Sequence, residues 1–94
     1  MLLVKLTTKL ATLITNRSAF LNGSLEGATS NKIYFEYGPT INFGRTTIPV
    51  TTSMIGDFGI NVPGLNPKTT YFYRAASNVN GAIIYGVVMS FSTN

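Results

Sequence analysis

Apolar and polar residues alternate with a period of two along several stretches of the chain. This period is typical of β-strands that bury one face, because successive side chains of a strand point to opposite sides. Strand-favouring residues are frequent, and long helix-favouring stretches are missing. The rows expected to face the core are Ala19, Leu21, Gly23 and Leu25; Ile33, Phe35 and Tyr37; Phe58, Ile60 and Val62; and Tyr71, Tyr73, Ala75 and Ser77. These choices leave Tyr34 and Arg74 on outward faces.

Turn-forming residues divide the chain into short segments. Pairs such as Gly38-Pro39, Asn66-Pro67 and Asn80-Gly81 recur at short intervals. The spacing of these turn residues predicts seven strands. Seven is the number found in an immunoglobulin-like sandwich of two antiparallel sheets. A bulge or a change of sheet near 11–13 would explain why apolar residues crowd both faces of the first strand. The expected strands lie at 4–15, 18–25, 32–37, 46–52, 58–62, 70–78 and 83–93.

The segment before the sixth expected strand predicts a tight corner. Pro67 follows Leu65 by two residues, and Tyr71 follows Leu65 by six. A Tyr in that position can bury its ring in the core while its hydroxyl group binds the backbone of the corner. Leu65, Pro67 and Tyr71 are therefore expected to build a structural corner.

Several stretches resemble the fibronectin type III-like modules of bacterial, archaeal and phage surface proteins. SAFLNGSL at 18–25 and IYFEYG at 33–38 are similar to two strands of that family, and LNPKTTYFYR at 65–74 is similar to its most specific run. The resemblance covers 10–94 and implies one domain over 1–94, in which 1–9 form an N-terminal extension or arm. The family often buries a Trp on the third strand, and this chain has none. The resemblance implies that Phe35 or Tyr37 takes its place.

The composition is that of one globular domain with little charge. The chain has 94 residues, of which 45% are hydrophobic and 11% charged, and this length allows one two-layer core. Seven basic and three acidic residues give a net charge of +4, and the basic residues are scattered. Nucleic-acid binders concentrate Lys and Arg on one face, so no nucleic-acid partner is expected. The longest apolar run, 82–89, has eight residues, against the ~20 of a membrane-spanning helix, so no membrane span is expected.

The residues that carry most enzymatic chemistry are missing from the sequence. The chain has no His and no Cys, which excludes Ser-His-Asp and Cys-His triads, disulfides and zinc sites of the ordinary ligand types. Glu26, Glu36 and Asp57 are the only acidic side chains, and nothing in their spacing pairs two of them across a cleft. The glycines are dispersed among turns and form no phosphate-binding loop. No enzyme activity, cofactor or metal ion is expected.

The last expected strand carries apolar side chains on both faces, although a sandwich strand needs only one buried face. Two interpretations stay open. A bulge or neighbouring side chains could cover the second face, or that face could contact a neighbouring subunit. In the second interpretation the interface residues are Ile84 and Val88 on the outward face, together with the apolar Met1, Leu2 and Leu3.

These observations predict a non-enzymatic structural or interaction module with protein partners, among them other copies of the same chain. The function expected first is that of a virion component, a phage capsid decoration or tail-associated protein. A single module that begins at Met1 without a signal peptide suits such a protein. The alternative is one repeat of a bacterial or archaeal cell-surface or carbohydrate-active protein, acting as a spacer or adhesion module. The expected locations are the virion surface and the cell surface, respectively.

Overall fold

The computed structural model describes residues 4–30, 32–50, 54–79 and 81–94, and these residues form strands and turns without a helix. The predicted all-β class is therefore confirmed, and the described part of the chain holds no helix that could cross a bilayer. Eight strands are present instead of the seven expected. Their bounds are β1 Lys5–Thr12, β2 Ala19–Ser30, β3 Ile33–Gly38, β4 Arg45–Thr46, β5 Met54–Val62, β6 Thr70–Val79, β7 Ala82–Tyr85 and β8 Met89–Ser92.

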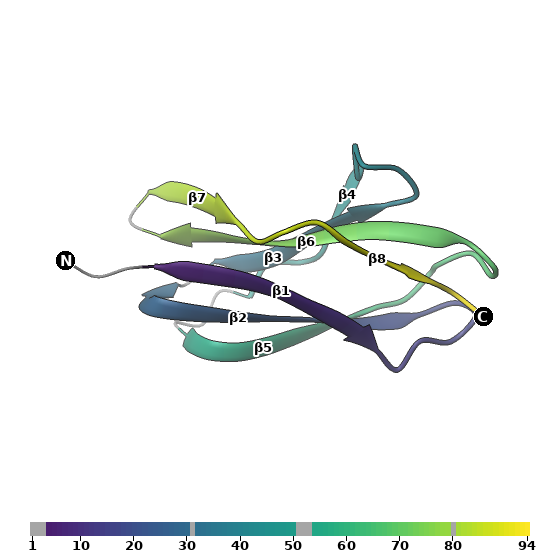
Figure 1. Ribbon diagram of the computed structural model, residues 1–94, viewed down its shortest axis with the longest axis horizontal. Coiled ribbons are helices and arrows are strands. Elements are labelled where there is room, and N and C mark those ends of the chain that lie inside the picture. Colours follow the sequence, from purple (N-terminus) through teal and green to yellow (C-terminus); the bar gives the residue numbers. More distant parts are fainter. Residues whose placement is uncertain (1–3, 31, 51–53, 80) are drawn as a thin grey trace.

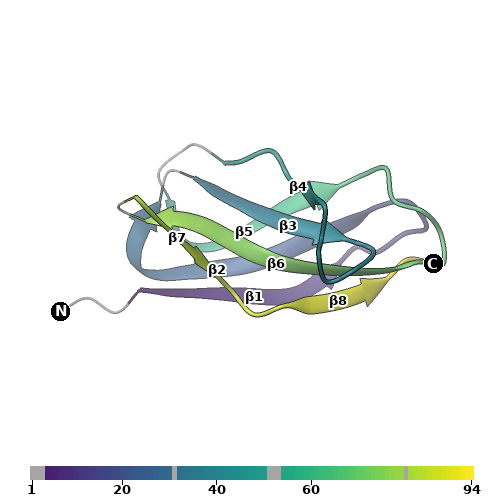
Figure 2. The ribbon, with the colours of Figure 1, turned by 90° about the horizontal axis from the view of Figure 1, so that it is seen from above.

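The strands form two antiparallel sheets that lie as two layers (Figure 1 and Figure 2). The three-stranded sheet has the order β1-β2-β5. The five-stranded sheet has the order β4-β3-β6-β7, and β8 also pairs with β6. β7 pairs with the 76–79 half of β6, whereas β8 pairs with the 70–73 half. The central strand β6 therefore organises the whole C-terminal part of the sheet.

The core between the sheets is filled mainly by the rows that the alternating pattern predicted. Aromatic rings from both sheets meet there, with ring centroids 5.6 Å apart for Phe35 and Phe58 and 5.7 Å apart for Tyr73 and Phe91. Gly23 makes room for one of them, because a Cβ at this position would lie 2.6 Å from the Phe58 ring. The members of the predicted rows with no exposed surface are Ala19, Leu21, Leu25, Ile33, Phe35, Tyr73, Ala75 and Ser77.

Tyr34 differs from its expected placement on a solvated face. It does point away from the core row of β3, but only 9% of it is exposed. Its neighbour across the strand pair is the small Ala76, which is itself opposite Tyr85 of β7. Lys32 also places its Nζ 5.9 Å from the centre of the Tyr34 ring. Neighbouring side chains on the outer face therefore cover the ring, which the alternation of β3 alone does not reveal.

The irregularity expected near 11–13 lies within β1. Its pairing with β2 shifts register between Lys9 and Thr12. Asn22 of β2 bridges the break, since its Nδ2 donates hydrogen bonds to the Leu10 carbonyl at 2.9 Å and to Thr12 Oγ1 at 3.0 Å. The bulge is therefore held by a specific side chain.

The strand expected at 83–93 is divided into β7 and β8, which explains the additional strand. Gly86 lies at the break, where its N–H donates to the Ala75 carbonyl at 2.9 Å. A Cβ at Gly86 would lie 2.3 Å from Thr8 Oγ1. The connection therefore passes directly against β1, and a side chain at this position would block the approach.

The start of the described chain belongs to the three-stranded sheet. Of the residues 1–9 expected as an extension or arm, 5–9 lie in β1 and pair with β2. Tyr73 of the opposite sheet donates a hydrogen bond to the Lys9 carbonyl at 2.7 Å. Residues 5–9 are consequently part of the fold, because β1 supplies one edge of the three-stranded sheet.

Candidate functional site

The corner before β6 has the geometry that its sequence pattern predicts. Tyr71 is 3% exposed and Leu65 1% exposed. The backbone N–H of Asn66 donates a hydrogen bond to the Tyr71 hydroxyl oxygen at 2.8 Å. The Pro67 carbonyl accepts a hydrogen bond from Thr69 Oγ1 at 2.9 Å. These residues fix the start of β6 and leave no open surface around the Tyr71 hydroxyl for chemistry.

The interface residues expected near the C-terminus do not share one face. Val88 lies in the connection between β7 and β8 and is 48% exposed. Ile84 instead packs against the core, because its partner in β6 is the inward-facing Ser77. Its expected outward orientation was wrong, since the division of the strand at Gly86 changes which side chains point inward. Met1, Leu2 and Leu3 lie outside the described residues, and the interface itself stays a prediction.

Two of the three acidic side chains, Glu36 and Asp57, are paired with cations on the outer faces of the two sheets. Glu36 Oε1 lies 2.6 Å from Arg74 Nε, and Asp57 Oδ1 lies 2.8 Å from Lys9 Nζ. The hydrogen bond and positive charge of Lys9 hold the pKa of Asp57 below its usual value. A general acid needs the opposite shift. Within the described ranges, no three His, Cys, Asp or Glu residues gather as metal ligands would.

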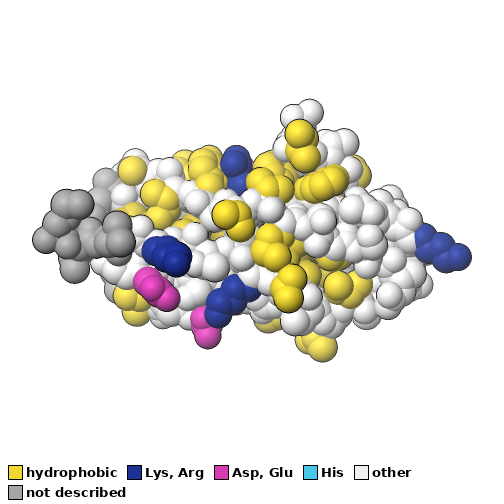
Figure 3. Space-filling model, in the orientation of Figure 1, with side chains coloured by type: hydrophobic (Ala, Val, Ile, Leu, Met, Phe, Trp, Pro, Cys, Tyr) yellow, Lys and Arg dark blue, Asp and Glu magenta, His cyan; other side chains and the backbone are white. Residues whose placement is uncertain are grey.

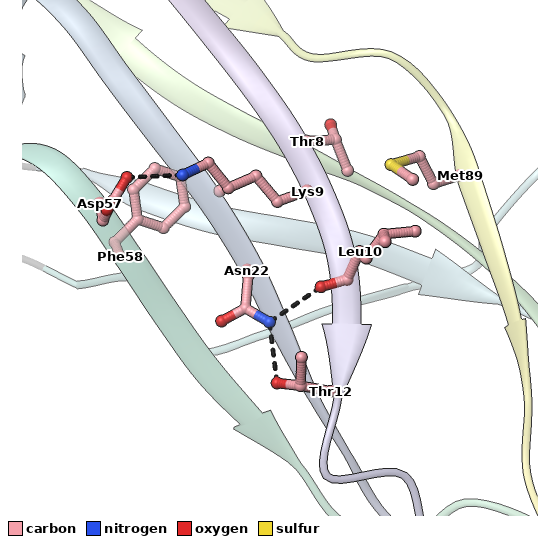
Figure 4. A pocket seen from close by; sticks show the side chains of 9 residues that line it. Thr8, Lys9, Leu10, Thr12, Asn22, Asp57, Phe58 and Met89 are labelled. Carbon is pink, nitrogen blue, oxygen red and sulfur yellow. Dashed lines mark hydrogen bonds and ion pairs between the residues drawn. The ribbon is translucent and has the colours of Figure 1, made fainter.

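A hollow lies along β1 at its bulge, and we call it the β1 groove. It has a volume of about 640 Å³. Figure 4 shows Lys9, Asn22 and Asp57 on one side of β1, with Thr8 and Met89 on the other. The residues that line the groove are Thr8, Lys9, Leu10, Thr12, Asn22, Gly23, Asp57, Phe58 and Met89.

Apolar side chains form much of the groove, and polar groups surround them. Leu10 is 71% exposed, and Met89 of β8 packs partly against the core. Figure 3 shows hydrophobic side chains gathered in the middle of this face, in the area where β1 and β8 run in Figure 1. Basic and acidic side chains lie beside them. Thr8 is buried, and its Oγ1 accepts a hydrogen bond from the Ala75 N–H at 3.1 Å. The wall that contains Thr8 is therefore fixed to the opposite sheet.

The polar rim of the groove is more accessible than its walls. The side chains of Lys9 and Asp57 are 46% and 79% exposed, so water screens their attraction and a ligand can replace either partner at little cost. The sequence pattern named none of the groove residues as a binding site. The sequence contained one indication of the groove, the apolar residues on both faces of the first expected strand. In the structure this crowding coincides with the bulge, and Leu10 is exposed to water.

Comparison with known proteins identifies the fold but no family. No protein-family model matches the chain, and no curated protein matches it. Among the solved structures that share the fold are three of the sensor domain of the anti-sigma factor RsgI4 in Pseudobacteroides cellulosolvens. Their sequence identities of 21–23% are too low to show more than a common fold.

The structural likeness extends over nearly the whole domain. A shorter form of the RsgI4 sensor domain matches with a TM-score of 0.69 and 23% identity over 96% of this chain and 93% of that one. A longer form gives a TM-score of 0.74 and 21% identity over 97% and 89%. A solution structure gives 0.71 and 22% over 97% and 75%. These neighbours are regulatory sensor domains, and this finding contradicts the expectation of a capsid or tail component.

Proposed function

We propose that this domain is a non-catalytic recognition module of the sensor type, which binds a small ligand in the β1 groove. The observation that carries the proposal is the groove itself. It combines an apolar interior with a few convergent polar groups, the combination that small-molecule sites usually have. The fold shared with the RsgI4 sensor domain supports the sensor role as an analogy.

The chemistry of the groove defines the ligand class. Leu10 and Met89 offer apolar surface, while Asn22 Oδ1 and the Lys9–Asp57 pair offer hydrogen bonds at the rim. A neutral molecule with an apolar body and a polar edge matches both. A strongly charged ligand without an apolar body would leave the apolar surface of Leu10 and Met89 uncovered.

We also propose that the two sheets form an immunoglobulin-like sandwich of the fibronectin type III-like kind. The buried Leu65, the hydrogen-bonded Tyr71 and the two-layer order of antiparallel strands support this assignment. The absence of enzyme activity, the protein partners and the location at a cell surface remain predictions. Turnover of any bound ligand would contradict the non-catalytic role.

A thermal-shift screen with neutral aromatic fragments such as indole tests the groove. A ligand at about ten times its dissociation constant adds about 1.4 kcal/mol to the free energy of unfolding, which raises the melting temperature of a domain of this size by about 5 to 10 °C. Leu10→Lys places a charge in the groove and should abolish the shift. Ile41→Lys adds the same charge at a position that is 69% exposed and outside the groove, and should preserve it. Equal shifts in the two variants, or no shift with any fragment, would contradict the proposal.

A further inference from the structure

A second cluster of polar and aromatic side chains lies on the outer face of the five-stranded sheet, away from the β1 groove. Arg74 of β6 and Glu36 of β3 are opposite each other in the strand pair. Their side chains are only 29% and 21% exposed, although both belong to an outer face. The Nε atom of Arg74 donates to Glu36 Oε1. Neighbouring groups must therefore cover this pair.

Two aromatic rings supply the cover. The guanidinium carbon of Arg74 lies 3.8 Å from the centre of the Tyr85 ring and 5.0 Å from the centre of the Phe43 ring. An Arg cation is attracted to the face of an aromatic ring, and the attraction increases as water is removed. The rings and Glu36 together fix the orientation of the guanidinium group. Arg74 is thus preorganised before any ligand arrives.

The loop at 39–44 adopts an unfavourable conformation that brings Phe43 to Arg74. Phe43 has a φ of 60°, in the left-handed region that a bulky residue rarely adopts. The backbone N–H of Phe43 donates to the Thr40 carbonyl at 2.9 Å, which closes a turn. A Cβ at Gly38 would lie 1.5 Å from the Phe43 carbonyl oxygen, so only glycine allows the loop to fold back on β3. Such strain persists where the surrounding structure enforces it, and it is concentrated at functional sites.

The donors of Arg74 are only partly used. The hydrogen bond to Glu36 occupies Nε. No residue in the described ranges accepts a hydrogen bond from its two terminal nitrogens. Arg74 lines a hollow of about 340 Å³, and Arg45 of β4 lines the same hollow. Two cations and one carboxylate leave this hollow with a net positive charge.

We propose that this hollow binds carboxylate groups of an acidic peptide. The planar edge formed by the terminal nitrogens of an Arg matches a carboxylate with two parallel hydrogen bonds. Glu36 acts as a positioning residue, because it holds Nε and turns the remaining edge of Arg74 outward. β4 and β6 are separated by β3, and Arg45 pairs with the inward-facing Tyr37. Arg74 instead pairs with the outward-facing Glu36. The two cations are therefore two strand spacings apart, about 10 Å, and leave the sheet on different sides. A chain with several carboxylates can place one of them on Arg74 and pass over the edge strand β4 to the exposed Arg45, whereas a short dicarboxylate cannot.

Binding of fluorescently labelled hexaglutamate at low ionic strength tests this proposal. The wild-type domain should bind it, and Arg74→Gln should weaken binding at least about tenfold, the factor expected for loss of a charge-assisted hydrogen bond. Arg17→Gln is the matched control, because it removes the same charge from an exposed position outside the hollow. Arg17→Gln should weaken hexaglutamate binding less than about twofold, because salt screens the attraction between distant charges. Equal losses in the two variants would mean attraction to net charge only and would overturn the site.

A second variant covers the case in which Arg74→Gln does not fold. Arg74→Lys keeps the charge and loses the planar edge, so we expect it to retain the wild-type circular dichroism spectrum and bind hexaglutamate more weakly than the wild type. Wild-type affinity in Arg74→Lys, or no binding of hexaglutamate by the wild type, would contradict the proposal. Succinate that binds as tightly as hexaglutamate would identify a small carboxylate, instead of a peptide, as the ligand. Leu10→Lys should leave hexaglutamate binding intact, which separates this site from the β1 groove.

Discussion

The outer faces of the two sheets each carry a lysine or arginine paired with a carboxylate, and the two pairs differ in their surroundings. Lys9 and Asp57 are 2.8 Å apart with side chains 46% and 79% exposed. Arg74 and Glu36 are 2.6 Å apart with side chains 29% and 21% exposed. Two aromatic rings contact the Arg74 guanidinium group.

The difference in exposure means that the two ion pairs can contribute to recognition in different ways. The Lys9–Asp57 pair is surrounded by water, so its members can exchange partners when a ligand enters the β1 groove. Arg74 is held by Glu36 and the rings, so it loses little freedom when it binds. The first face can adapt to a ligand, whereas the second is already in a binding geometry.

The largest effect should come from filling the space that glycine leaves on each face. In Gly38→Ala the new Cβ meets the Phe43 backbone, so the whole loop must move, and we expect a loss of about 3 kcal/mol in the free energy of unfolding. In Gly59→Ala the new Cβ meets the ring of Phe20 and, at 3.1 Å, Asn22 Oδ1, which are side-chain atoms that can move more easily than the backbone. The loss there should be smaller. Urea denaturation measures both, and equal losses would show that the loop is not held in place by Gly38.

Removal of the two cations should have unequal effects on stability. Arg74→Ala removes a charge-assisted hydrogen bond and the packing against two rings, and we expect a loss of about 2 kcal/mol. Lys9→Ala removes only an ion pair that water screens, and it should lower the urea midpoint much less. A similar change in midpoint for the two variants would remove the distinction between the faces.

A smaller effect is expected where the two sheets are joined beside the β1 groove. Tyr73→Phe removes the hydroxyl group that donates to the Lys9 carbonyl at 2.7 Å, and the expected loss is about 1 kcal/mol. Because this bond fixes β1 at its bulge, hydrogen exchange at 8–12 should accelerate more than exchange in β3. Uniform acceleration in both strands would show that the bond does not hold the groove specifically.

The smallest effects concern pH, and they have opposite signs on the two faces. The pKa of Asp57 is lowered by Lys9 from an ordinary value of 3.8, so its stabilising contribution is present above that pH and is lost as the pH falls through the folded-state pKa. Burial and the nearby Tyr85 and Glu36 raise the pKa of Tyr34 above 10.0. Its contribution is present below pH 10.0 and is lost as the pH rises through the folded-state pKa.

Nuclear magnetic resonance titration of the Asp57 carboxyl carbon and the Tyr34 ring measures both values. Lys9→Ala should return the pKa of Asp57 toward 3.8 and leave Tyr34 unchanged. A pKa of Asp57 that does not respond to this substitution would contradict the ion pair in solution.

Local patterns predicted the parts of the fold that depend on neighbours along the chain. The inward rows of β2 and β6 follow from alternation, and the Tyr71 corner follows from the spacing of Leu65, Pro67 and Tyr71. The division between β7 and β8 could not be predicted in this way. It depends on the contact of Gly86 with Thr8, which lies in a distant part of the chain.

The two binding surfaces were missed for the same physical reason. The apolar residues around the bulge indicated an irregular strand, but the groove also needs Asn22 of β2 and Met89 of β8. On the other face, Arg74 was expected in water. Its burial depends on a left-handed Phe43 in a loop and on Tyr85 in another strand, neither of which is visible from the alternation of β6.

The most direct test of the recognition role is a map of backbone amide chemical shifts during titration with the best fragment from the thermal-shift screen. The account predicts saturable shifts concentrated at 8–12, 22–23, 57–58 and 89, the residues that line the β1 groove. Shifts in the 39–44 loop and at Arg74 should be negligible with a neutral fragment, because that face offers charge to a carboxylate. Saturable shifts centred on any other part of the chain, with the β1 groove unaffected, would contradict the proposed site.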